Sequence, residues 1–305
     1  MDRWQSMRVF VKVAETGGFA EASRKLFMSP PAVTRAIAFL EEAIGAQLLV
    51  RTTRSVKLTD TGRRYFEDCQ RILADLADAE AAAAGSYSTP AGTLVITTPV
   101  LFGQIHVLPI VMAYLEQHKA VTAQLLFLDR IANLIEEGMD VAVRIGRLPD
   151  SELNAIRVGT VRRVVCASPA YLAEHGAPLL PADLAAHSVI ANVGAWPSLE
   201  WRFGRERKTT VSIRPQLVCN LNEAAITAAI DGWGLTRVLS YQIAPAVREG
   251  RLRIVLADYE EDPLPVHIVH AGGRSASAKV RSFVDFAVEK LRANEIFGEH
   301  TASGT

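Results

Sequence analysis

Apolar residues recur every three or four positions through the first 45 residues, which is the period of amphipathic helices. The pattern predicts a first helix that contains Trp4 and Phe10 and ends at Thr16-Gly17-Gly18, and a short second helix over 19–26. After Phe27-Met28, a third helix is predicted with an apolar face made of Val33, Ala36, Ile37, Leu40 and Ile44. Two short helices joined by a tight turn make a helix-turn-helix, although most helical hairpins do not bind DNA.

The third helix begins with the sequence MSPPAVTRAI, residues 28–37. Pro30 and Pro31 suit its first turn, because the first amides of a helix have no acceptor within the helix. Ser29 is predicted to cap the helix, its hydroxyl accepting a hydrogen bond from one of those amides. The opposite face is small and polar with a single long cation, and it carries Pro31, Thr34, Arg35 and Ala38. We expect this face to contact a partner.

The stretch AQLLVRTTRSVKLTDTG follows Gly45 and predicts a short β-hairpin. Its cations Arg51, Arg54 and Lys57 are interspersed with small hydroxyl side chains, Thr53 among them. This composition suits contacts with phosphate oxygens or with a narrow minor groove. A hairpin that is merely solvated is the alternative.

Residues 60–88 predict a long helix. Tyr65, Cys69, Ile72, Leu76, Ala79 and Ala83 are separated by 4, 3, 4, 3 and 4 positions, the spacing of a coiled-coil seam. We expect Cys69, Ile72 and Leu76 to pair with a second copy of the chain. In the alternative interpretation, the helix packs on its own domain.

From Thr93 onward, strand patterns alternate with helical ones. The predicted strands are LVITT, AQLLFL, VAVRI, VVCAS, SVIAN, LVC, LTRVL and PVHIVH, and the predicted helices cover 104–117, 222–231 and 276–293. This alternation indicates a mostly parallel sheet, or two of them. About 200 residues of this kind suit two α/β subdomains with a cleft between them.

Charge is distributed unevenly although the 305 residues sum to zero. Residues 1–65 contain eleven Lys or Arg and six Asp or Glu, a net charge of +5, so the remainder carries −5. A basic first domain favours a polyanionic partner. No apolar run reaches the roughly 18 residues that span a bilayer, and the N-terminus lacks a signal-peptide pattern. Three scattered cysteines without a CxxC motif favour a reducing cytoplasm.

The sequence offers little catalytic chemistry. It contains no GxSxG, HExxH or P-loop motif, and no GxGxxG that opens a helix after a strand. The seven histidines are scattered, and nothing in the sequence brings Cys166 near His187 as a nucleophile and its base. We therefore predict no catalytic site, no cofactor and no metal site.

Candidate ligand-binding residues lie where predicted strands end, the edge at which α/β folds bind ligands. Thr98 offers a hydroxyl, and the amides after it could hold a carboxylate. Arg144 could bind a ligand or pair with an internal carboxylate, and Phe203 could line a cleft or pack in a core. The candidate set is Thr97, Thr98, Val100, Phe102, Asp129, Arg144, Ile145 and Phe203. Hydroxyls and amides beside apolar side chains favour a small organic acid as the ligand.

Three motifs in the first 65 residues closely resemble LysR-type transcriptional regulators. They are FVKVAETGGFAEASRKL, SPPAVTRAIAFLE and LLVRTTRSVKLTDTG. The resemblance continues in GTLVITTPVLFG, GMDVAVRIGRLPDS, VVCASPAYLAEHGAP and GLTRVLSYQIAPAVREGRL, so it covers nearly the whole chain. One departure is Gly18, which stands where many family members have a serine that caps the second helix.

The resemblance implies an α+β multidomain fold: a winged helix-turn-helix at 1–59, a dimerising linker helix at 60–88, and an effector-binding domain at 92–305. It implies two lobes like those of periplasmic binding proteins, lobe I at about 92–162 and 269–293 and lobe II at about 163–268. It further implies three partners: double-stranded DNA, RNA polymerase and a small-molecule effector that binds between the lobes. The chain is expected to form dimers and tetramers. No membrane is expected as a partner. By the family pattern, DNA is contacted by Ser29, Pro30, Pro31, Thr34, Arg35, Arg51, Thr53 and Arg54.

The function that we predict is therefore a ligand-responsive regulator of transcription in the bacterial cytoplasm. A solute-binding module or an enzyme on the periplasmic-binding-protein fold is the alternative. The missing signal peptide and the presence of residues 1–88 speak against that alternative.

Overall fold

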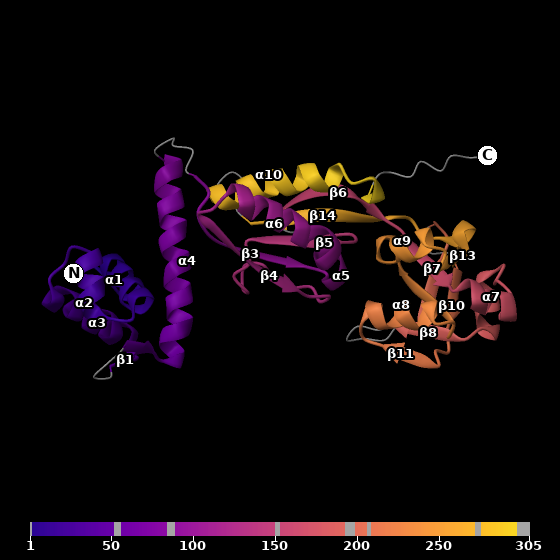
Figure 1. Cartoon of the computed structure of the whole chain (residues 1–305), viewed down its shortest axis with the longest axis horizontal. Helices are drawn as coiled ribbons and strands as arrows, with labels where there is room; N and C mark the ends of the chain where they lie inside the picture. The colour runs from indigo at the N-terminus through magenta and orange to yellow at the C-terminus, as the bar shows by residue number, and fades with distance from the viewer. Residues whose placement is uncertain are drawn as a thin grey trace. The chain divides into compact units, whose positions relative to one another are not determined.

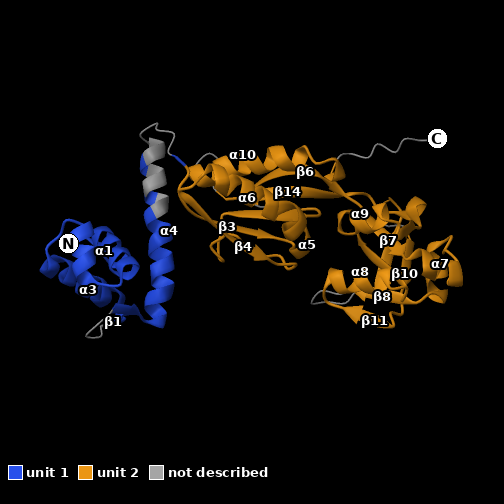
Figure 2. Cartoon of the chain, in the orientation of Figure 1, with its two compact units in different colours: residues 1–89 blue, residues 90–305 orange. Residues whose placement is uncertain are grey.

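The computed structural model of the chain describes residues 2–51, 56–83, 89–149, 153–192, 199–205, 209–271 and 276–297. It divides into two compact units, residues 1–89 and residues 90–305 (Figure 2). Thr53, Arg54 and Trp196 lie outside the described residues. Each unit has its own hydrophobic core.

Unit 1 contains four helices and one hairpin among its described residues (Figure 1). The predicted three helices are confirmed, and Gly17 and Gly45 end the first and third in the left-handed conformation that glycine adopts readily. The elements are α1 (Arg3–Thr16), α2 (Phe19–Lys25), α3 (Pro30–Ile44), β1 (Leu49–Arg51), β2 (Val56–Leu58) and α4 (Asp60–Ala83).

The core of unit 1 forms where the apolar faces of α1, α3 and the start of α4 meet. Phe10 is fully buried, and its ring lies 5.8 Å from the ring of Tyr65 and 6.4 Å from that of Phe66. Val33, Ala36, Ile37 and Leu40 are buried from α3, as the sequence predicted. Each large side chain buried in this way contributes about 1.5–3 kcal/mol to folding.

Polar contacts fix the hairpin β1–β2 to the helices on either side of it. A carboxylate oxygen of Glu41, near the end of α3, accepts hydrogen bonds from the amides of Leu48 and Leu49 at 2.7 and 3.1 Å. Before α4, the Thr59 hydroxyl accepts from the amide of Gly62 at 2.8 Å. A Cβ at Gly62 would lie only 1.9 Å from the carbonyl oxygen of Leu48, so this position requires glycine.

The predicted seam of α4 divides into two parts. Cys69 is fully buried in the core of unit 1, which corrects its assignment to a contact between two chains. Its neighbours Tyr65 and Phe66 also pack on this core, so the first part of the helix belongs to its own domain. Ile72 and Leu76, one and two turns further, are 43% and 36% exposed.

In its described residues, unit 2 has two five-stranded sheets, each the centre of one lobe (Figure 1). The sheet of lobe I has the order β4-β3-β5-β14-β6, with β3 parallel to β4 and β5 and with β14 antiparallel to β5 and β6. Its strands are β3 (Gly92–Thr98), β4 (Val121–Phe127), β5 (Val141–Ile145), β6 (Asn154–Val161) and β14 (Leu264–His270). The prediction was one mostly parallel sheet or two of them; unit 2 has two sheets, and each is mixed.

The helices of lobe I cover its sheet. They are α5 (Val100–Phe102), a π-helical turn over Gly103–Val107, α6 (Leu108–Gln117), α10 (Ala278–Arg292) and a short 3₁₀ turn at Glu295–Phe297. The stretch 100–117 is long and apolar enough to cross a membrane by length and composition. Phe102, Val107, Val111 and Tyr114 from this stretch are buried in the core of lobe I, whereas Ile105, Leu108 and Met112 are exposed.

The sheet of lobe II has the order β11-β8-β12-β7-β13. Its strands are β7 (Arg163–Ala167), β8 (Val189–Asn192), β11 (Leu217–Cys219), β12 (Leu235–Leu239) and β13 (Arg253–Val255), and a separate hairpin pairs β9 (Glu200–Phe203) with β10 (Thr209–Ser212). The helices are α7 (Pro169–His175), α8 (Asn222–Ile230) and α9 (Ser240–Arg248), with 3₁₀ turns at Pro181–Ala186 and Ala257–Tyr259.

The chain crosses between the lobes twice. The first crossing joins β6 to β7 at Arg162, as predicted. The second was predicted at residues 268 and 269, which is wrong, because all of β14 from Leu264 pairs with β5 and β6 in lobe I. The return therefore lies in the segment 260–263, before β14 begins.

Candidate DNA interface and effector site

The outward face of α3 is exposed at the start of the helix. Ser29, Pro30, Pro31 and Arg35 are exposed and Thr34 is half-buried, while the opposite face is buried in the core. The two prolines occupy the first helical positions, as predicted. Because a helix start is the positive end of the helix dipole and Arg35 adds an exposed cation, this face suits contact with a polyanion.

Ser29 caps α3 through its backbone rather than its side chain. Its backbone is extended, and its carbonyl accepts from the amides of Ala32 and Val33 at 2.9 and 3.1 Å. The predicted hydrogen bond from a first-turn amide to the Ser29 hydroxyl is absent, which corrects that expectation. The hydroxyl is therefore available to a partner at the exposed start of the helix.

The predicted hairpin after α3 is confirmed by the antiparallel pairing of β1 and β2, in which Arg51 lies opposite Val56. Lys57 on β2 is exposed. The amide of Val56 donates to the carbonyl of Gly17 at 3.3 Å, which ties the second strand to the end of α1.

The candidate effector residues of lobe I gather where β3 meets α5. Thr97 and Thr98 are fully buried; the Thr97 hydroxyl has no hydrogen-bond partner, and the Thr98 hydroxyl lies 3.4 Å from the Pro99 carbonyl oxygen. The carboxylate of Asp129, just after β4, accepts from the amide of Val100 at 3.0 Å. One of the amides predicted to hold an effector carboxylate is thus occupied by a carboxylate of the protein itself.

Arg144, at the end of β5, donates to the carbonyl of Ala132 at 3.1 Å. Burial lowers the pKa of its guanidinium. The carboxylate of Glu137, which could have paired with Arg144, accepts instead from both terminal nitrogens of Arg130, at 2.8 and 2.6 Å. Arg144 is therefore held by a backbone carbonyl.

Two of the candidate effector residues pack in hydrophobic cores, which corrects their assignment to a cleft. Phe102 is fully buried, with its ring 5.2 Å from the rings of Tyr241 and Phe297 and 5.1 Å from that of His106. Phe203 is buried in the core of lobe II, under the guanidinium of Arg237 at 5.1 Å.

This aromatic cluster joins the lobes, because Tyr241 lies on α9 of lobe II and packs in the core of lobe I. Burial raises the pKa of the Tyr241 hydroxyl. His106, from the π-helical turn, leaves its Nε2 atom buried without a hydrogen-bond partner, and burial lowers its pKa to about 4. Its imidazole is therefore neutral at physiological pH.

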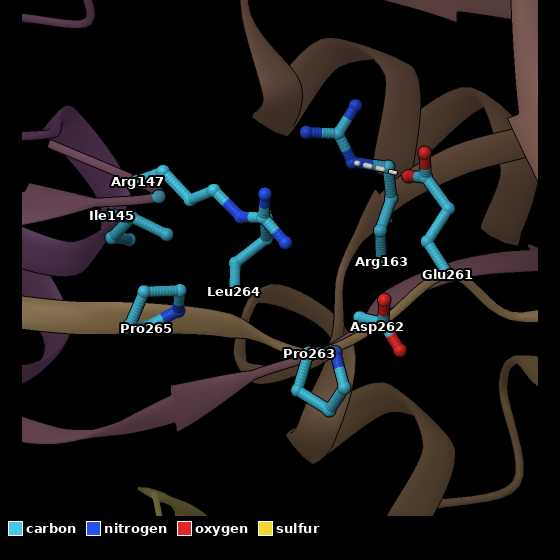
Figure 3. Close-up of a pocket in the computed structure, with 9 residues that line it drawn as sticks. Ile145, Arg147, Arg163, Glu261, Asp262, Pro263, Leu264 and Pro265 are labelled. Atoms are coloured by element: carbon cyan, nitrogen blue, oxygen red, sulfur yellow. Dashed lines mark ion pairs between the residues drawn. The ribbon is translucent and has the colours of Figure 1, made fainter. Parts of the chain in front are cut away.

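A pocket of about 490 Å³ lies at the two crossings between the lobes (Figure 3). It is lined by Ile145, Gly146 and Arg147 after β5, by Arg163 at the start of β7, and by the returning segment 261–265. In Figure 3 the side chains of Arg147 and Arg163 point toward each other across the pocket. Its volume falls in the range of small-molecule sites.

Arg163 forms a long ion pair with one acidic residue of this pocket, Glu261, which lies closer to another arginine. Glu261 lies 3.7 Å from Nε of Arg163 but only 2.7 Å from Nη2 of Arg237, which is buried with it. The side chain of Arg163 stays 42% exposed. Arg147, Arg163 and Glu261 come together only where the chain returns from lobe II to lobe I. The sequence placed this return at residues 268 and 269 instead of 260–263, so these three residues were not predicted.

Comparison with known protein families gives two matches. The model described as "Bacterial regulatory helix-turn-helix protein, lysR family" matches residues 4–63, and that described as "LysR substrate binding domain" matches residues 88–292. The chain belongs to the LysR family of transcriptional regulators. It combines a helix-turn-helix with an effector-binding domain of the LysR type, and it is not an enzyme.

Several curated transcriptional regulators match along nearly the whole chain. An HTH-type transcriptional regulator of Xanthomonas campestris is 35% identical over 93% of this chain and 84% of its own length. CrgA of Neisseria meningitidis is 32% identical over 95% of this chain and 97% of its own length. The transcriptional activator AaeR of Escherichia coli is 31% identical, covering 95% of each protein.

Solved structures of full-length LysR regulators match as well. CrgA of Neisseria meningitidis superposes with a TM-score of 0.61 at 31% identity, over 95% of this chain and 99% of that one. AphB, a virulence activator of Vibrio cholerae, gives a TM-score of 0.60 at 26% identity, over 93% of this chain and 98% of that one. The fold deduced from the sequence is thus confirmed.

Two thiols of this LysR-family chain, Cys69 and Cys166, are buried and poor nucleophiles. Burial raises the pKa of Cys166 to about 12 and that of Cys69 to about 11. Cys166 packs on one face of the lobe II sheet, whereas His187 bonds to Tyr171, whose core lies on the other face. Cys166 and His187 therefore do not form a pair. Among the described residues, no three His, Cys, Asp or Glu side chains cluster as metal ligands do.

Proposed function

We propose that this regulator binds promoter DNA as a homodimer or tetramer in the bacterial cytoplasm, contacts RNA polymerase and responds to a small organic acid. The exposed start of α3 supports the DNA contact, with Ser29, Pro30, Pro31, Thr34 and Arg35 in the major groove and the hairpin beside it on the phosphates. Arg51, Thr53 and Arg54 belong to that hairpin in this proposal.

The observation that carries the effector proposal is the pocket between the lobes. Arg147 comes from lobe I and Arg163 from the start of lobe II, so one carboxylate held by both would favour a particular arrangement of the lobes. An effector changes the activity of a regulator to the extent that it binds one arrangement more tightly than the other. A carboxylate that bridges two arginines on different lobes has this property.

The end of β3 forms the other part of the proposed site. Thr97, Thr98, Val100, Asp129, Arg144 and Ile145 contribute to it, and Ile145 also lines the pocket. Asp129 already places a carboxylate on the first amide of the helix that starts at Val100. In this proposal, the carboxylate of the effector therefore binds the arginines of the pocket, and other polar atoms of the effector form hydrogen bonds with the hydroxyls of Thr97 and Thr98.

Replacement of either pocket arginine tests the effector site. Arg147→Ala or Arg163→Ala removes a charge-assisted hydrogen bond of about 1.5–3 kcal/mol, so the Kd for an acid effector should rise roughly 10- to 100-fold. The effector is first found among carboxylic acids by the rise in melting temperature of the full chain. The same titration is then repeated on the variants.

Arg248→Ala, which removes an exposed arginine of α9, is the matched control and should bind the acid like the parent. If both pocket variants retain the parent affinity for an acid that stabilises the parent, the acid binds elsewhere.

Thr98→Val tests the β3 end separately. Valine keeps the shape of the buried side chain and removes the hydroxyl, so DNA affinity should be unchanged while the transcriptional response to the acid falls. A reporter assay in which the variant responds with the parent's midpoint and amplitude would remove Thr98 from the site.

A further inference from the structure

The turn between α2 and α3 places a phenylalanine in an unusual conformation. The amide of Met28 donates to the carbonyl of Ser23 at 3.0 Å, and that of Phe27 to the carbonyl of Arg24 at 3.3 Å. These two bonds form a Schellman motif, whose penultimate residue adopts the left-handed conformation and is usually glycine, sometimes asparagine. Here that residue is Phe27, with φ of 54°.

The ring of Phe27 is 96% exposed. Its chain neighbours Leu26 and Met28 pack against the core of unit 1, so the turn itself is well anchored. A left-handed backbone and a fully solvated aromatic ring are both unfavourable, and folding gains nothing visible from either. A strained residue of this kind, held in place by its surroundings, points to a function.

The turn holds this ring outward. The hydroxyl of Ser23, which is buried, donates to the carbonyl of Met28, so Ser23 and Met28 are joined by two hydrogen bonds across the turn. Phe27 lies between them as the projecting residue. A ring fixed in this way loses little further backbone freedom when it contacts a partner.

The surroundings of Phe27 indicate the partner. Ser29 and Pro30, two and three residues later, begin the exposed face of α3. Arg24 and Lys25, in the last turn of α2, are exposed cations, and Arg24 pairs with Glu21 one turn earlier. An apolar ring beside cations and a helix start matches a surface on which phosphates alternate with apolar deoxyribose carbons and thymine methyl groups.

We propose that Phe27 contacts DNA next to α3, through the apolar carbon surface of the duplex. This inference rests on the proposed DNA interface and adds a residue to it. A protein partner would also accept an exposed ring, but the adjacent cations and the basic charge of residues 1–65 favour a polyanion.

Phe27→Asn separates this role from a structural one. Asparagine adopts the left-handed conformation readily, so the melting temperature of the full chain should stay the same or rise. Loss of the ring should raise the Kd for DNA about tenfold, and Phe27→Leu, which keeps an apolar side chain, should restore part of the affinity. The probe is a duplex selected by the parent protein from a random-sequence pool, titrated by fluorescence anisotropy.

Deoxyuridine substitution distinguishes the two apolar sources on the duplex. Removing one thymine methyl in each half-site should weaken the parent and leave Phe27→Asn unaffected if the ring contacts a base. The other outcome is that every such substitution changes the Kd of the parent and of Phe27→Asn by the same factor, while Phe27→Asn still binds more weakly than the parent. In that case the ring packs on deoxyribose.

Two results would overturn the proposal. Parent-like DNA affinity of Phe27→Asn overturns it, and if reporter activity then falls, the ring contacts a protein instead. A lower melting temperature that accounts for the weaker binding shows a structural role. Arg35→Ala in the same titration is the reference. If Arg35→Ala binds DNA weakly and Phe27→Asn does not, only the proposed role of Phe27 fails. If both variants bind like the parent, the whole proposed α3 interface fails.

Discussion

Leu76→Asp is expected to yield monomers that no longer bind the full DNA site. Leu76 and Ile72 are exposed apolar side chains of α4 in the single chain, although Cys69, one turn earlier, is buried in unit 1. We expect a second copy to cover them, since such residues spaced along one helix are typical of a coiled-coil seam. A carboxylate in that contact would lose its hydration without gaining a partner.

The expected loss is several kcal/mol, and each 1.4 kcal/mol raises the dimer dissociation constant about tenfold. Light scattering at micromolar protein gives the molar mass directly. Gln70→Asp adds the same charge to an exposed position of α4 off the seam and should leave the molar mass unchanged. A Leu76→Asp protein with the parent's molar mass would show that α4 does not carry the contact.

Arg35→Ala is expected to weaken DNA binding by about 1–3 kcal/mol and to relax specificity at one base pair of each half-site. Arg35 is the exposed cation of α3, one turn beyond the helix start, and the buried side of that helix fixes its direction. Arginine most often contacts guanine, because its two donors match the O6 and N7 acceptors.

Mobility-shift titrations of the parent and the variant on a set of single-base operator variants measure both effects. Arg251→Ala removes an exposed arginine of unit 2 that pairs with Glu249, and it should bind every duplex like the parent. A uniform loss across all the duplexes would make Arg35 a phosphate contact instead.

The N-terminal domain was largely predictable from the sequence because its signals are local. Helical periodicity, the glycines that end α1 and α3, and the two prolines that begin α3 all act within a few residues. The Ser29 hydroxyl cap was a wrong detail within a correct helix, since the backbone alone satisfied the amides of Ala32 and Val33.

Assignments that depend on distant packing were the ones that failed. The spacing that placed Cys69 on a seam between two chains is equally satisfied by packing on α1, and sequence spacing does not tell these apart. Phe102 lies at the correct edge of the sheet, but Tyr241 and Phe297, far along the chain, enclose its ring.

The strand β6 was also missed, because its sequence NAIRVGTV mixes exposed and buried positions without a clear alternation. β6 pairs with β14 from the far end of the chain and so completes the sheet of lobe I. The boundary between the lobes, and with it the arginines of the pocket, follows from that pairing. Long-range strand pairing is fixed by the whole sheet rather than by the strand itself.

The position of Tyr241 has a consequence for how unit 2 folds. The ring of this lobe II residue fills space in the core of lobe I, and Leu101 of lobe I packs in turn against a core of lobe II. Removing either lobe would leave a cavity in the other, so neither is a complete folding unit. We expect unit 2 to unfold in a single cooperative transition. A chimaera that carries lobe II of a relative should fold stably only when the residues that face Tyr241 and Leu101 are exchanged as well.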